Sequence, residues 1–122
     1  MAIDPRGSDL KRFLAEDADG PIVMLNLLRF ADGGRARYGE YARAVEPLLR
    51  ARGAEVLYAG DGAAALVAED GQSWDAVLVV RYPSRAAFSA MVADPAYQRI
   101  AHLRSEALRE AVLQPTTPWS GR

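Results

Sequence analysis

The sequence predicts an α+β fold in which helices cover one face of a single antiparallel sheet. Two segments, 21–30 (PIVMLNLLRF) and 74–82 (WDAVLVVRY), are apolar on both faces and are typical of buried strands. Apolar residues at helical spacing separate these two segments and follow the second one. The predicted order is a first helix and then β-α-β-β-α-β, which is the split β-α-β order of ferredoxin-like domains.

The first helix is expected in residues 8–20, where Ser8 can cap the N-terminus and Gly20 can end the helix. After a turn, a second helix is expected over 38–52, although Pro47 removes one backbone donor and should kink it. The remaining predicted elements are a strand at 54–60, a continuation strand and exposed turn at 62–73, a short helix at 83–92, a long helix at 94–112 and a short strand or extended tail at 113–119. Ser84 and Asp94 are the expected caps of the last two helices.

The length suits one domain, expected over residues 1–122, with an N-terminal helical extension at 1–20 and a tail at 115–122. A formal net charge of -1 and the lack of a basic block argue against a nucleic-acid partner. The sequence has no cysteine, which excludes disulfides and thiolate metal sites. The longest apolar run is too short for a membrane span, and the N-terminus lacks the apolar block of a signal peptide, so a cytoplasmic protein is expected.

The two strong strands also predict an assembly. Helices in this fold cover only one face of the sheet, yet both predicted strands carry apolar residues on both faces. The second face therefore needs another cover, and a second copy of the chain is the simplest one. We expect a homodimer.

Four segments carry a resemblance to a known family: GPIVMLNLLRF, YGEYARAVEPLL, WDAVLVVRYPSRAAF and DPAYQ. Together they resemble the bacterial proteins classed as domain of unknown function 1330, over nearly the whole chain. The resemblance implies a dimeric α/β-barrel, in which two ferredoxin-like sheets pack face to face, and it accounts for Pro47 within a helix. It implies no activity, because related barrels include cofactor-free monooxygenases, haem-using enzymes, isomerases and simple ligand binders.

Asn26 is a polar residue inside the first apolar strand, and burying its amide without a partner would cost about 1–3 kcal/mol. It either bonds to a neighbouring loop or backbone group, or it faces a cavity. In the second interpretation, Asn26, Arg81 and a tyrosine grip a small carboxylate or carbonyl compound. Arg81 could instead point to solvent at its strand end. Asp75 lies on the same strand face about 20 Å from Arg81, so these two cannot pair.

The long helix at 94–112 places Arg104 in the middle of its apolar face, beside Tyr97. A guanidinium in that position has to be paired or has to reach a cavity. It either forms a salt bridge, with Asp75 or with the Asp94 region, or serves as an anion anchor. Tyr41 on the preceding long helix is either a core anchor or a pocket residue.

The ligand-binding candidates are therefore Asn26, Tyr41, Asp75, Arg81, Tyr97 and Arg104. His102, the single histidine, falls on the opposite face of its helix, which weakens mechanisms that need a histidine base or ligand. We predict no metal site, no cofactor and no identified catalytic residue. The expected function is binding of a small anionic or carbonyl metabolite in a pocket beside the sheet. The alternative is a cofactor-independent enzyme, monooxygenase-like or isomerase-like, and the sequence leaves open whether the chain is an enzyme.

Overall fold

The computed structural model describes residues 2–16 and 20–119. Its elements are α1 (Gly7–Ala15), β1 (Ile22–Phe30), α2 (Gly34–Ala51), β2 (Glu55–Asp61), β3 (Ala76–Tyr82), α3 (Arg85–Ala93), α4 (Pro95–Ala107) and β4 (Leu108–Thr116). The strands form one antiparallel sheet in the order β2-β3-β1-β4. The predicted α+β fold with its split β-α-β order is confirmed. In the described part of the chain, no helix is both long and apolar enough to cross a bilayer.

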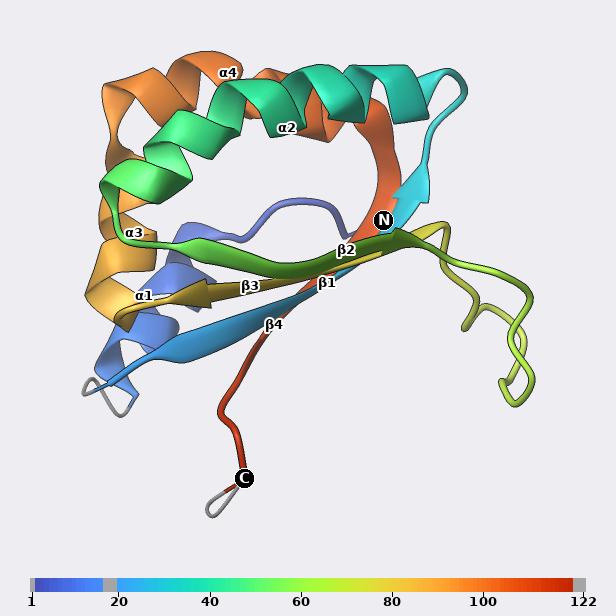
Figure 1. The fold of residues 1–122 in the computed structure, drawn as a ribbon, viewed down its shortest axis with the longest axis horizontal. Helices are drawn as coiled ribbons and strands as arrows, with labels where there is room; N and C mark the ends of the chain where they lie inside the picture. Colours follow the sequence, from blue (N-terminus) through green and yellow to red (C-terminus); the bar gives the residue numbers. More distant parts are fainter. Residues whose placement is uncertain (1, 17–19, 120–122) are drawn as a thin grey trace.

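The helices lie on one side of the sheet. In Figure 1, α2 and α4 run across one face, while α1 and α3 pack together at one end of it. The opposite face carries no helix from the described residues. A core forms between the helices and the sheet, and its buried members are Phe13, Ile22, Met24, Tyr41, Val45, Val80, Tyr82, Phe88 and Met91.

The side chains of the central strand β1 alternate between the face covered by helices and the open face of the sheet. Met24 and Leu28 are buried beneath the helices at 3% and 0% exposure. Leu25 and Leu27 point to the other face and are only half-buried. β1 pairs with β3 on one side and with β4 on the other, so its backbone is bonded along both edges.

The C-terminal prediction is confirmed for the strand expected from 113, which extends to Thr116, and it is wrong for the helix beyond Ala107. The predicted helix over 94–112 ends there, and Leu108 begins β4 without an intervening loop. Apolar residues in this stretch fit helical spacing and also fit strand alternation. Pairing decides between the two, because Ala111 and Leu113 lie opposite Leu28 and Asn26 of the central strand.

Other boundaries also move. α2 begins at Gly34, earlier than predicted, and continues through Pro47. α1 is capped by Arg6 together with Asp9 rather than by Ser8, and it ends at Ala15. The rest of the predicted first helix includes residues 17–19, which lie outside the described residues. β2 ends at Asp61, so the predicted continuation strand is wrong.

The predicted caps of the last two helices are confirmed. Ser84 Oγ accepts a hydrogen bond from the backbone N–H of Ala87 at 3.0 Å, at the start of α3. Asp94 Oδ1 accepts from the backbone N–H of Ala96 at 2.8 Å, at the start of α4. Each cap satisfies a donor that the first turn of a helix leaves free.

The N-terminus of α2 touches the junction between α4 and β4. The Ala31 N–H donates to the Ala107 carbonyl at 2.8 Å. A Cβ atom added at Gly34 would lie 2.0 Å from that same carbonyl oxygen. No residue with a Cβ atom could bring the backbone this close to the Ala107 carbonyl. Glycine at position 34 therefore allows α2 to pack directly against the junction.

We expect Gly34→Ala to destabilise the protein by about 1–3 kcal/mol, because the added methyl must displace the backbone of the junction. Gly39→Ala is the matched control in the same helix, since its Cβ would lie 3.7 Å from Arg43 Nη1, an ordinary contact. The control should be neutral or stabilising by up to about 1 kcal/mol, as alanine favours helix. Urea denaturation measures the free energy of unfolding of each variant. Equal changes in Gly34→Ala and Gly39→Ala would contradict the close packing of Gly34 against the junction.

Candidate functional site

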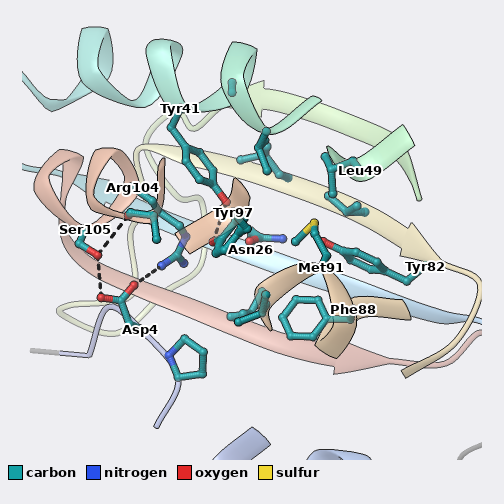
Figure 2. Close-up of a pocket in the computed structure, with 18 of the residues that line it drawn as sticks. Asp4, Asn26, Tyr41, Leu49, Tyr82, Phe88, Met91, Tyr97, Arg104 and Ser105 are labelled. Atoms are coloured by element: carbon teal, nitrogen blue, oxygen red, sulfur yellow. Dashed lines mark hydrogen bonds and ion pairs between the residues drawn. The ribbon is translucent and has the colours of Figure 1, made fainter. Parts of the chain in front are cut away.

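A cavity of about 410 Å³ lies between α2, α4 and the sheet. Figure 2 shows side chains from both helices, from the strands and from the N-terminal segment directed into it. Its apolar wall includes Val45, Leu49, Phe88, Met91 and Leu113. Its polar groups include Asp4, Asn26, Tyr41, Tyr97, Arg104 and Ser105. A mostly apolar hollow with a few converging polar groups is typical of small-molecule sites.

Two tyrosines connect the helices across the cavity. The hydroxyls of Tyr41 on α2 and Tyr97 on α4 are hydrogen-bonded at 3.0 Å. Burial raises the pKa of Tyr41 well above its ordinary value, and the adjacent Tyr97 raises it further. Burial also raises the pKa of Tyr82, which lines the same cavity. Tyr41 and Tyr82 therefore stay protonated at neutral pH and can donate hydrogen bonds.

Arg104 provides the positive charge of the cavity and is only 5% exposed. Its Nη1 donates to the carbonyl oxygen of Ile3 at 2.7 Å and to Asp4 Oδ1 at 2.9 Å. Ser105 Oγ donates to the other carboxylate oxygen of Asp4 at 2.8 Å. Arg104 Nη2 is buried and has no hydrogen-bond partner among the described residues. A buried donor without a partner costs about 1–3 kcal/mol, more for a charged group.

The partner of Arg104 differs from the prediction. We expected a salt bridge with Asp75 or with the Asp94 region, but the structure pairs Arg104 with Asp4. Asp75 lies just before β3, where its Oδ2 accepts from the backbone N–H of Phe30 at 2.9 Å. Asp94 caps α4 and also pairs with Arg52 at 3.2 Å. Both carboxylates therefore bind other parts of the fold and do not pair with Arg104.

Asn26 faces the cavity from the middle of β1. Among the described residues, its side chain makes one hydrogen bond, from Nδ2 to the carbonyl of Met24 at 3.5 Å. That distance is at the weak limit for such a bond, so the amide is poorly satisfied within the protein. The backbone-bonding interpretation of Asn26 therefore rests on this weak contact alone.

Arg81 does not join the cavity. It follows Val80 on β3, and Val80 lines the cavity, so alternation turns Arg81 to the opposite face of the sheet. There it lies opposite Glu55 of β2 in the register. Of the six candidates, the structure thus brings together Asn26, Tyr41, Tyr97 and Arg104 and leaves out Asp75 and Arg81.

Sequence reasoning missed Asp4 and Tyr82. Asp4 reaches the cavity because the N-terminal segment crosses to α4, and no local pattern signals a contact over such a chain separation. Tyr82 alternates with Arg81, so assigning the faces of β3 would have found it. His102 is exposed, as its helical position predicts. Within residues 2–16 and 20–119, no cluster of His, Asp and Glu side chains could hold a metal ion.

We expect Asn26→Leu to leave the free energy of unfolding unchanged or to raise it by about 1 kcal/mol, because the amide loses only a weak bond. Thr116→Val is the matched control on the neighbouring strand, since Thr116 Oγ1 donates to the Val23 carbonyl at 2.8 Å. The free energy of unfolding of this control should fall by about 1 kcal/mol, because the variant loses the hydrogen bond. Urea denaturation checks both, and a loss of about 1–3 kcal/mol in Asn26→Leu would show that the amide supports the scaffold.

Several solved structures resemble this one. The RPA0582 protein of unknown function from Rhodopseudomonas palustris is 32% identical, with a TM-score of 0.88 and 97% of each chain covered. A dimeric ferredoxin-like protein of unknown function from Jannaschia sp. CCS1 is 14% identical, with a TM-score of 0.62 over 81% of this chain and 100% of that chain. A putative antibiotic biosynthesis monooxygenase from Bacteroides thetaiotaomicron is 22% identical, with a TM-score of 0.60 over 81% of this chain and 90% of that chain.

The last two likenesses show a shared ferredoxin-like fold and nothing further. None of the curated proteins matches this chain. The sequence pattern of the domain of unknown function DUF1330 matches residues 28–114. That match includes β2, β3 and three helices that line the cavity, α2, α3 and α4, and it agrees with the likeness to RPA0582. The resemblance drawn from the sequence is confirmed: this chain belongs to the DUF1330 family.

Proposed function

We propose that this chain is a homodimeric binding protein that holds a small anionic or carbonyl compound in the cavity. The observation that carries the proposal is Arg104 Nη2, a buried donor without a partner among the described residues. A ligand oxygen next to Nη2 would supply the missing acceptor. Binding would then recover the free energy that this donor loses in the empty protein.

Other groups support the same placement. Figure 2 shows Asn26 and the hydrogen-bonded tyrosines Tyr41 and Tyr97 in the same cavity as Arg104. Each of these side chains has hydrogen-bonding capacity that its protein contacts leave unused. The surrounding wall is apolar, which favours a ligand with one polar end.

Binding is favoured over the alternative of a cofactor-independent enzyme. Proton transfer is most efficient when the catalytic group ionises near the working pH. Burial raises the pKa of Tyr41 and of Tyr82, which removes both as bases at neutral pH. His102 is exposed on α4 and does not line the cavity. The likeness to a putative monooxygenase is a likeness of fold, so it does not favour the enzyme.

We expect some compound in a thermal-shift screen of small carbonyl compounds and carboxylates to stabilise the protein, and Arg104→Met to abolish that shift. The free energy of unfolding of Arg104→Met should fall by only about 1–2 kcal/mol, because the Asp4 side chain is 51% exposed and stays solvated. Breaking a fully buried ion pair would cost about 3–5 kcal/mol. Arg99→Met is the matched control on the exposed side of α4 and should keep the response. A shift that survives Arg104→Met would exclude the proposed site.

The dimer is proposed from the face of the sheet opposite the helices. Its apolar residues are half-buried and belong to three strands: Val23, Leu25, Leu27, Val77, Val79 and Val112. Leu27 lies at the centre, opposite Val77 on one side and Val112 on the other. An apolar face of this kind is typical of an association surface. The fold-level likeness to the Jannaschia protein, which is described as dimeric, supports a second copy as the cover.

We expect light scattering to give twice the mass of one chain. Leu27→Glu should give a monomer, because a carboxylate would be buried at the centre of the interface. Leu66→Glu makes the same change in the fully exposed loop between β2 and β3 and should remain dimeric. A parent protein that runs as a monomer would contradict the proposed assembly and leave the cavity proposal untouched, since the two lie on opposite faces.

A further inference from the structure

We propose that the cavity selects neutral carbonyl compounds over carboxylates, with Asp4 as the residue that sets this preference. This inference rests on the proposed binding function and narrows its ligand class. It follows from the charges that line the cavity, from the hydrogen-bond donors left free there, and from the apolar wall.

The charge of Arg104 is already balanced inside the protein. Asp4 Oδ1 lies 2.9 Å from Arg104 Nη1, and Ser105 holds the second carboxylate oxygen of Asp4. An anionic group that accepts from Nη2 would share one guanidinium with the Asp4 carboxylate and would be repelled by it. Glu46, the other acidic side chain among the described lining residues, pairs with Arg50 and adds no positive charge. The cavity therefore has no surplus of positive charge for an anion.

Three of the polar side chains on the cavity lining offer hydrogen-bond donors to a ligand. Arg104 Nη2 is buried with no partner among the described residues. In the Tyr41–Tyr97 pair one hydroxyl donates to the other, so one hydroxyl proton remains available. Among the described residues, Asn26 Nδ2 has only its long contact with the Met24 carbonyl. A carbonyl oxygen has two lone pairs and no charge, so it can accept from two such donors without meeting the repulsion of Asp4.

The rest of the cavity is lined by apolar side chains, so a ligand that fits it should carry its carbonyl group on an apolar skeleton. Phe88, Met91 and Leu49 line the part of the cavity beyond the polar groups (Figure 2). The volume of about 410 Å³ lies within the range of sites for compact organic ligands. An aromatic ketone satisfies both conditions, because it carries one acceptor on a flat apolar skeleton.

The test compares three naphthalene compounds of nearly equal shape: methyl naphthyl ketone, naphthoate and ethylnaphthalene. The ketone and the carboxylate differ in one position, where a methyl group replaces a charged oxygen. In calorimetric titrations at neutral pH, we expect the ketone to bind at least about tenfold more tightly than either of the others. Naphthoate binding as tightly as the ketone would overturn the inference.

The variant Asp4→Asn removes the negative charge and keeps an oxygen that can accept from Arg104. We expect it to strengthen naphthoate binding by about tenfold or more and to change ketone binding by less than about threefold. Asp70→Asn is the control, since it makes the same charge change in the exposed loop between β2 and β3. An unchanged ratio of the two affinities in Asp4→Asn would overturn the role of Asp4.

The two proposals fail differently. If carboxylates from the thermal-shift screen bind through Arg104 and the naphthyl ketone does not, the preference for neutral carbonyls is overturned and the binding function stands. If no carbonyl compound and no carboxylate binds, the binding function itself is overturned. A ketone that binds equally well to the parent and to Arg104→Met would overturn the placement of its oxygen beside Nη2.

Discussion

A guanidinium buried between a helix and a sheet has to be neutralised where it lies, and this requirement shapes one end of the protein. Arg104 draws Ile3 and Asp4 to α4 through a carbonyl and a carboxylate. The Ala111 N–H of β4 donates to the Ala2 carbonyl at 2.8 Å, which fixes the same segment from the other side. The N-terminal segment thereby becomes a wall of the cavity. Asp4 and the Ile3 carbonyl both bind Nη1, and Nη2 has no partner among the described residues, which makes it the donor for the proposed ligand.

The central strand separates the two surfaces to which we assign the proposed ligand binding and the proposed association. Asn26 points into the cavity, whereas Leu25 and Leu27 on either side of it point to the open face. A second copy on the open face would leave the cavity uncovered, because the two surfaces lie on opposite sides of β1. Ligand binding and association can then be altered independently by neighbouring residues of one strand.

Sequence patterns predicted β1, β2 and β3, the caps of α3 and α4, and the helical phase that placed Tyr41, Tyr97 and Arg104 on apolar faces. They failed where two structures satisfied the same pattern. β3 is apolar on both faces, so alternation alone could not decide whether Arg81 or Tyr82 meets the helices. Residues 108–112 suit a helix and a strand equally, and pairing with β1 decided between them. The contact of Asp4 with Arg104 joins the two ends of the chain, beyond the reach of any local signal.

α4 passes directly into β4, with Ala107 ending the helix and Leu108 starting the strand. One uninterrupted piece of chain therefore builds both the wall that carries Arg104 and the floor that carries Leu113. Inserting a single residue on the helical side would rotate Arg104 by about 100° relative to the sheet. Inserting it on the strand side, before Ala111, would turn both Ala111 and Leu113 to the opposite face of the sheet. Homologous chains that accommodate larger or smaller ligands should therefore differ at this junction in side-chain volume and not in length.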